Sequence, residues 1–218
     1  MVFNVAMRLS NLSFAAGPAG LASSVARLED ALGSTFRDGG FHPRFGTRNK
    51  ILPVLGDRYL EVVEVLEHPA AEKAVFGQVV RARSEMGGGW FAWVLEVDDL
   101  GPIEERLGRK SVHGSRQFPD GRRLEWEQIG IRGLMADPQL PFFFRWISEP
   151  DLRPSALAPA DVEILEIRLS GSPERVSEWL GCELGPVFDG VALTFGAPNG
   201  VPGIESVTFR CPKGVVTL

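Results

Sequence analysis

The segment GGFHPRFGTRNKILPVLGDRYLEVVEV, which spans residues 39–65, decides the fold of this 218-residue chain. Apolar and polar residues alternate within it on both sides of a Gly-Asp pair, which is a strong signal for a tight turn between strands. The pattern predicts strands over residues 47–55 and 58–66, and a further strand is expected over residues 35–41. Consecutive strands joined by short turns indicate antiparallel pairing.

The order of elements around this segment recurs along the chain. A strand over residues 6–15 and a helix over residues 20–33 come before the three strands, which gives the order β-α-β-β-β. The second copy has these predicted elements: a helical connection over 71–86, a strand over 90–97, a helix over 99–109, and strands over 112–118, 122–129 and 141–147. A third, shorter copy has these: a strand over 162–169, a helix over 173–180, and strands over 187–195 and 204–211. The sequence therefore predicts an α+β protein with largely antiparallel sheets.

A Pro-rich stretch, EPDLRPSALAPA, separates the third copy from the first two. Such a composition is typical of a connection between folded units. We expect a paired βαβββ unit over residues 1–148, a linker over residues 149–160 and a partial third βαββ module over residues 161–218.

The composition is that of an ordinary globular protein. Hydrophobic residues make up 44% of the chain and charged residues 23%, and the formal net charge is −5 with a pI near 5.3. The negative charge gives no general attraction to nucleic acid or to an anionic membrane surface. No apolar run approaches the roughly 20 residues that span a bilayer. With two cysteines that form no CxxC motif, these features predict a cytoplasmic protein with reduced thiols and with neither nucleic acid nor membrane as a partner.

Residues 39–61 resemble the glyoxalase-like branch of the vicinal oxygen chelate superfamily. That branch has a Gly-Gly-x-His-Pro-x-x-Gly-Thr-x-Asn run, followed by Leu-Gly and then Tyr-Leu-Glu. The matching residues here are Gly39, Gly40, His42, Pro43, Gly46, Thr47, Asn49, Leu55, Gly56, Tyr59, Leu60 and Glu61. A second stretch, LPFFFRW over residues 140–146, is similar to the closing strand of the second module. The resemblance implies that tandem βαβββ modules form curved sheets around a cup, with the partial third module beside them.

Superfamily members that hold a divalent metal bind it with residues of the first and last strands of their modules. Glu61 matches the last-strand ligand position. Ser10 and Asn11 stand where many relatives have Asp-His, and the amide of Asn is a weak neutral donor that does not replace imidazole for first-row metals. The first strand of the second module presents no ligand on the face that carries Trp93. We therefore expect no cofactor, and a divalent metal bound through Glu61 is the alternative.

Two residues of the motif are candidates for catalytic chemistry. Glu61 shares a strand face with Tyr59 and two valines, and an ionised carboxylate on such a face needs a hydrogen bond, an ion pair or a metal. The simpler interpretation is an ion pair of this carboxylate with Arg48 or Arg58. His42 precedes a proline on an extended segment, where a neutral imidazole can orient a substrate, act as a general base or hold the adjoining turn.

Further side chains are expected to line the cup. They are Asn11, Thr47, Asn49, Tyr59, Trp93, Phe144 and Trp146. His113 and Arg116 lie on a basic strand region that we expect to face solvent. An anionic group of a ligand could instead meet Arg122, Arg123 or Arg145.

A cup lined by aromatic side chains opposite one carboxylate is typical of a site for a flat or apolar small molecule. We expect the chain to bind such a molecule without the standard metal. The alternative is a metal-dependent lyase, isomerase or dioxygenase that uses Glu61 and His42, because the fold hosts all of these activities. A third interpretation is a subunit that mainly assembles with a partner. A homodimer is open under each of them, since related modules often pair between chains.

Overall fold

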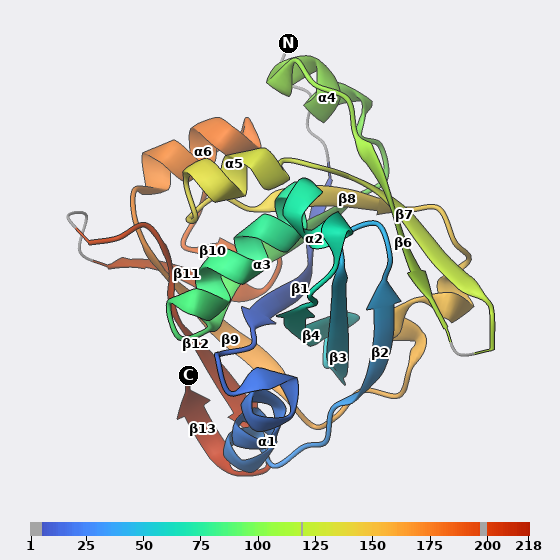
Figure 1. The fold of residues 1–218 in the computed structure, drawn as a ribbon. Coiled ribbons are helices and arrows are strands. Elements are labelled where there is room, and N and C mark those ends of the chain that lie inside the picture. The colour runs from blue at the N-terminus through green and yellow to red at the C-terminus, as the bar shows by residue number, and fades with distance from the viewer. Residues whose placement is uncertain (1–5, 119, 197–199) are drawn as a thin grey trace.

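Eight strands close into a barrel in the computed structural model, which describes residues 6–118, 120–196 and 200–218 (Figure 1). The strands are β1 (Met7–Ala15), β2 (Arg37–His42), β3 (Thr47–Val54), β4 (Arg58–Val65), β5 (Gly89–Val97), β6 (Val112–Gln117), β7 (Arg123–Ile129) and β8 (Phe142–Trp146). Their order around the barrel is β1-β4-β3-β2-β6-β7-β8-β5. The cup is therefore completed within one chain.

The barrel consists of two modules with the same topology. In each module the first strand lies parallel to the last, as β1 does to β4 and β5 to β8, and the other neighbours are antiparallel. The modules are joined where β1 pairs with β5 and β2 pairs with β6, both antiparallel. This arrangement confirms the predicted α+β fold of tandem βαβββ modules around a cup.

The segment over residues 39–65 forms the two hairpins at the centre of the first module. Gly56 and Asp57 have φ angles of 84° and 56° in the turn between β3 and β4, as the two central residues of a tight hairpin turn require. Side chains alternate along β4, so Leu60 packs into the outer core while Glu61 points into the barrel. The local turn signal thus sets which face of β4 reaches the cup.

Short helices cover the outside and the ends of the barrel. They are α1 (Gly20–Leu32), α2 (Pro69–Lys73), α3 (Val75–Glu85), α4 (Gly101–Leu107) and α5 (Ile131–Ala136). One end is covered by α3 and α5, whose Phe76, Val80 and Leu134 pack against apolar side chains of the strands. Two 3₁₀ turns, η1 (Pro150–Leu152) and η2 (Pro154–Ala156), lie at the other end, where η2 contacts β3 and β4.

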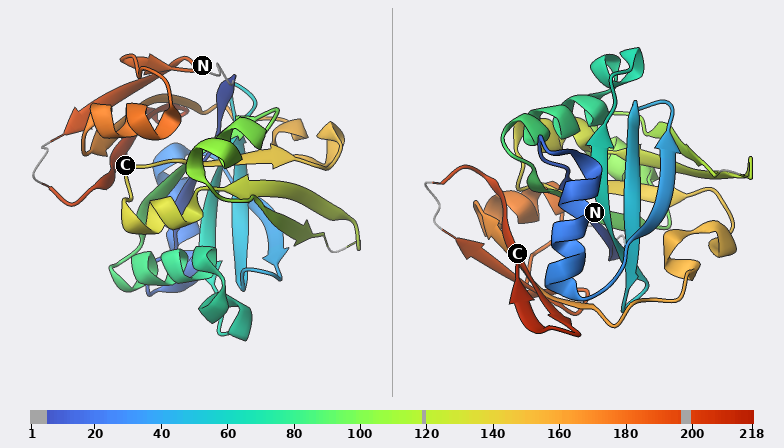
Figure 2. Two further views of the ribbon diagram at one scale, coloured as in Figure 1. Left: turned by 90° about the horizontal axis from the view of Figure 1, so that it is seen from above. Right: turned by 60° about the horizontal axis from the view of Figure 1, so that its bottom comes forward.

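The C-terminal part of the chain forms a second sheet. Its elements are β9 (Glu163–Ser170), α6 (Pro173–Leu180), β10 (Val187–Phe188), β11 (Val191–Gly196), β12 (Gly203–Cys211) and β13 (Gly214–Thr217), with strand order β10-β11-β9-β12-β13. The sheet packs on the outside of the barrel (Figure 2): the rings of Phe209 and Trp90 are 5.9 Å apart, and those of Phe188 and Trp93 are 6.1 Å apart. The barrel, α1 and this sheet share one hydrophobic core.

Some elements differ from the prediction. The helical connection over 71–86 is split into α2 and α3, because Ala74 between them is extended at ψ 128°. The predicted strand over 187–195 is the hairpin β10–β11, whose turn holds Asp189 and Gly190 at positive φ. The prediction lacks α5 and β13, since six and four residues are too few to show a clear hydrophobic period.

Candidate functional site

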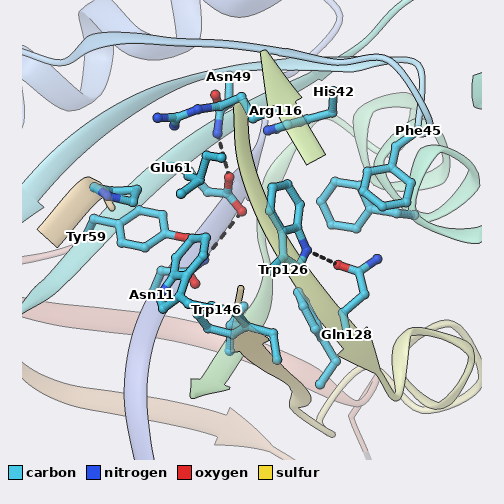
Figure 3. Close-up of a pocket in the computed structure, with 16 residues that line it drawn as sticks. Asn11, His42, Phe45, Asn49, Tyr59, Glu61, Arg116, Trp126, Gln128 and Trp146 are labelled. Carbon is cyan, nitrogen blue, oxygen red and sulfur yellow. Dashed lines mark hydrogen bonds between the residues drawn. The ribbon is translucent and has the colours of Figure 1, made fainter. Parts of the chain in front are cut away.

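A pocket lies inside the barrel, and all eight strands contribute to its wall (Figure 3). Its lining consists of Asn11, His42, Phe45, Asn49, Tyr59, Glu61, Phe76, Val94, Arg116, Leu124, Trp126, Gln128, Phe142, Phe144, Trp146 and Pro154. These side chains leave a cavity of about 50 Å³ between them, which is room for a few water molecules. Figure 3 shows Glu61, Asn49 and Tyr59 on one side of the pocket, and Trp126, Phe45 and the amide of Gln128 on the other.

Glu61 is the centre of a buried hydrogen-bonded cluster on β4 and is only 8% exposed. Ser13 Oγ donates to its Oε1 at 2.5 Å, and Asn49 Nδ2 donates to its Oε2 at 2.8 Å. Asn11 Nδ2 adds a longer bond to Oε1 at 3.4 Å. Burial raises the pKa of Glu61, while the bonds from Ser13 and Asn49 and the charge of Arg116 oppose that rise. The carboxyl group is thus held in place by neutral donors.

Neither arginine that could pair with Glu61 according to the sequence does so. Arg48 Nε lies 2.6 Å from Glu64 Oε2, and Arg58 Nη2 lies 3.0 Å from Asp189 Oδ2. The carboxyl group of Glu61 therefore remains directed toward the pocket.

The double glycine of β2 brings the backbone close to two polar side chains of the pocket. A Cβ at Gly39 would lie 1.9 Å from Asn49 Oδ1, and a Cβ at Gly40 would lie 3.5 Å from Arg116 Cγ. Gly40 also has a φ of 101°, which residues with a Cβ rarely adopt. Gly39 therefore lets the side chain of Asn49 pass close to the backbone of β2, while Gly40 is required by its positive φ and by the carbonyl oxygen of Gln117, 2.9 Å from where a Cβ would be.

His42 ends β2 and is buried in the pocket wall. Its Nδ1 lies 3.0 Å from Thr47 Oγ1, and its ring meets Trp126 edge to face at a centroid distance of 6.0 Å. Burial, together with the charge of Arg116, lowers the pKa of His42 to about 3. The imidazole is therefore neutral near pH 7 and too weakly basic for efficient general-base catalysis. Thr47 lies behind His42 and is not part of the pocket lining.

Arg116 lines the pocket and is only 4% exposed, so the expectation that it faces solvent is wrong. It stands opposite Leu124 of β7, which also faces inward, whereas His113 faces outward and pairs with Glu125 at 3.2 Å. The register between β6 and β7 decides this facing. The basic composition of the strand favoured a solvated face. The one signal for an inward Arg116 is that it shares a strand face with Gly114, two residues before it.

Aromatic rings form much of the rest of the pocket wall, which is called the aromatic wall below. Phe144 and Trp146 point into the pocket from alternate positions of β8, with their ring centroids 4.7 Å apart. Trp126 of β7 contacts Trp146 edge to face at 5.9 Å. Phe45 and Phe76 complete this wall, and their ring centroids are 5.6 Å apart. Neither residue was expected in the cup from the sequence.

Trp93 lies outside the pocket, contrary to expectation. It is fully buried in the core between the barrel and the C-terminal sheet, and its Nε1 donates to the carbonyl oxygen of Gln139 at 2.9 Å. The β1–β5 register shifts next to Ser13, so Phe91 is an extra residue on β5. This β-bulge places Phe91 and Trp93 on different faces, which strict alternation does not predict.

The end of the pocket near η2 combines Asn11, Tyr59 and Pro154. Asn11 and Tyr59 are partners in the β1–β4 register. Burial raises the pKa of Tyr59 well above its ordinary value, so its hydroxyl group stays protonated. Because Pro154 belongs to the lining, the stretch expected as a linker supplies part of the site.

The polar residues of the pocket do not fit the divalent metal that the superfamily implies. Among the residues the structure describes, no group of three His, Cys, Asp or Glu side chains could hold a metal ion. Asn49 directs its amide nitrogen toward Glu61, while its Oδ1 is buried next to Gly39. Arg116 adds a positive charge, which opposes a further cation. The pocket thus offers one imidazole, that of His42, and one carboxylate, that of Glu61, without a third ligand of the kind that first-row metals prefer among the described residues.

Comparison with known proteins places this architecture among characterised families. A family model described as "Glyoxalase-like domain" matches residues 13–183. A hypothetical protein from Staphylococcus aureus shares the fold with a TM-score of 0.71 at 15% identity, over 96% of this chain and 93% of its own. Methylmalonyl-CoA epimerase from Mycobacterium tuberculosis gives a TM-score of 0.44 at 18% identity, over 70% of this chain and 95% of its own. A comparison with curated protein sequences finds no match.

The family match spans both modules of the barrel and extends to the C-terminal sheet, so it includes the whole pocket except Asn11. No helix in the described part of the chain is long and apolar enough to cross a membrane. The matching fold agrees with the motif over residues 39–61. This chain belongs to the glyoxalase-like domain family.

Proposed function

We propose that the chain binds a small, flat aromatic molecule inside the barrel, without a divalent metal. The observation that carries this proposal is a pocket lining that combines several aromatic rings with the fixed carboxyl group of Glu61. Aromatic faces supply apolar contact with preferred ring geometry, and a few fixed polar groups set the orientation of the ligand.

The carboxyl group of Glu61 is the orienting group in this proposal. Ser13 and Asn49 hold its two oxygens, so its position needs little rearrangement when a ligand arrives. In its ionised form it accepts a hydrogen bond from a ligand hydroxyl or amine, and in its protonated form it donates one. If the bound molecule reacts, this carboxyl group is better suited than His42 to exchange a proton with it, because the pKa of His42 is about 3.

The size of the cavity sets a condition for binding. A cavity of roughly 150 Å³ is known to hold benzene, whereas this one is about 50 Å³. A ring therefore enters only when side chains move. Trp126 and Trp146 are the partly exposed members of the aromatic wall, so they are the ones that can swing outward most easily.

Ligand-observed saturation-transfer NMR tests the proposal with benzamide as the probe and cyclohexanecarboxamide as its saturated counterpart. We expect transfer to benzamide in the wild type, at least about a tenfold weaker affinity in Trp126→Leu, and no change in Trp179→Phe. Trp179 lies in the outer core, with its Nε1 bonded to the Pro141 carbonyl, and is the matched control. Equal transfer to the saturated probe, or full binding in Trp126→Leu, would overturn the proposal.

Elemental analysis tests the metal-free part separately. Protein purified without chelators or a histidine tag should hold no Fe, Mn, Ni or Zn above background, and Glu61→Ala should leave that content unchanged. A stoichiometric metal that is lost in Glu61→Ala would instead support a metal-dependent lyase, isomerase or dioxygenase that uses Glu61 and His42.

A further inference from the structure

We infer that the ligand carries a carboxylate group and that Arg116 binds it. The inference rests on the proposed function and names its ligand class, an aromatic carboxylate.

Arg116 is a buried cation without a bonded anion. Its Nε is buried and has no hydrogen-bond acceptor among the described residues. The guanidinium interacts electrostatically with Glu61, Tyr59 and Asp38, without a hydrogen bond to any of them. The centroid of the Phe118 ring lies 4.6 Å from its central carbon. A buried charge normally has a hydrogen-bonded partner, because removing it from water is costly. The unused donors of Arg116 are therefore available to a ligand at the pocket wall.

The surrounding backbone keeps the guanidinium there. The methylene groups of Arg116 lie against Gly40, at 3.5 Å and 3.7 Å from where a Cβ would be, which is ordinary van der Waals contact. The ring of Trp126 fills the space over Gly114, which lies two residues before Arg116 on β6. The alternation on β6 thus directs Arg116 alongside an aromatic ring rather than toward solvent.

A positively charged groove borders the same pocket. It measures about 470 Å³ and shares Phe45, Phe76 and Gln128 with the pocket lining. Four cationic side chains line it: Arg44, Arg109, Lys110 and Arg132. No Asp or Glu of the described residues belongs to this lining, although Glu104 pairs with Lys110 from outside it at 2.9 Å. In a chain with a net charge of −5, such a groove attracts anions locally.

A carboxylate fits this guanidinium better than other anions do. The planar fork of Arg matches the two oxygens of a carboxylate, and a planar group needs the least room in a narrow cavity. An aromatic carboxylate would then place its charge on Arg116 and its ring against the aromatic wall.

NMR of the arginine Nε–Hε groups tests the inference directly. The Arg116 signal is assigned by its absence in Arg116→Met, and it is followed during titration with acetate, acetamide, benzoate and benzamide. We expect acetate and benzoate to shift the signal downfield, acetamide to leave it unchanged, and bound benzamide to shift it less than benzoate does. In calorimetry, benzoate should bind at least about tenfold more tightly than benzamide. That preference should be lost in Arg116→Met and kept in Arg145→Met, whose arginine pairs with Glu127 on the outer face.

The outcomes separate this inference from the proposed function. Benzamide and benzoate binding with equal affinity would overturn the carboxylate assignment and leave aromatic binding intact. Acetate shifting the Arg116 signal while no aromatic compound binds would support the carboxylate site and overturn the proposed function. No shift with either carboxylate, or an equal shift with inorganic phosphate, would overturn the inference.

Discussion

Replacing Arg116 by methionine should make the unliganded protein more stable. The side chain is 4% exposed and its Nε has no acceptor among the described residues, so folding removes a charge from water without full compensation. Replacing buried ionic groups by apolar ones of similar volume is often stabilising, by about 1–4 kcal/mol. The lost contact with Phe118 offsets about 1–2 kcal/mol of this gain. The middle of the first range less the middle of the second gives an expected net gain of about 1 kcal/mol for Arg116→Met.

Urea unfolding followed by tryptophan fluorescence measures this change. For a chain of this length, each kcal/mol corresponds to about 2–4 °C in Tm, so calorimetry gives an independent check. Arg145→Met is the control, because its partly exposed pair with Glu127 should contribute less than about 1 kcal/mol. If Arg116→Met lowers stability by more than 1 kcal/mol with an unchanged m-value, Arg116 is a structural residue and the reasoning is refuted.

Three further predictions follow from the pocket and its surroundings. Because the pKa of His42 is about 3 in the folded protein and about 6.5 in the unfolded chain, its contribution to stability is complete above pH 6.5 and is lost as the pH falls toward 3, by up to about 1.4 kcal/mol per unit. His42→Gln should flatten the slope of the free energy of unfolding between pH 4.5 and 6.5, and an unchanged slope would contradict this. Trp93→Phe should lower the free energy of unfolding by about 1–3 kcal/mol without changing benzamide affinity, and a weaker affinity would place Trp93 in the site after all. Gly39→Ala should displace Asn49, whose Oδ1 lies 1.9 Å from the new Cβ, and so raise the pKa of Glu61 further in a carbon-13 NMR titration, whereas an unchanged pKa would show that the Asn49 bond survives.

The architecture could be predicted because its signals are local. The Gly-Asp turn and the alternation on either side define β3 and β4 within a few residues, and the recurrence of β-α-β-β-β predicts paired modules. The same alternation correctly orients Glu61 and the aromatic residues of β8 such as Trp146, since a strand face is set by period two.

The composition of the pocket depends on features that are not local. Ser13 and Arg116 reach the site through strand pairing between distant segments, and neither belongs to the motif that marks the family. Trp93 lies on the other face of β5 from the predicted one, because the β-bulge at Phe91 changes the alternation along the strand. Pro154 joins the lining because a Pro-rich stretch forms 3₁₀ turns against the barrel. Pairing register and bulges of this kind are decided by tertiary packing rather than by the sequence around each residue.

Calorimetric titration of benzoate into chelator-dialysed protein tests the central claim most directly. The account predicts saturable binding at one site per chain, with an affinity that does not change when Zn²⁺, Mn²⁺ or Fe²⁺ is added. Benzoate binding that begins only after a metal is added would contradict a metal-free aromatic site, and so would the absence of any saturable binding.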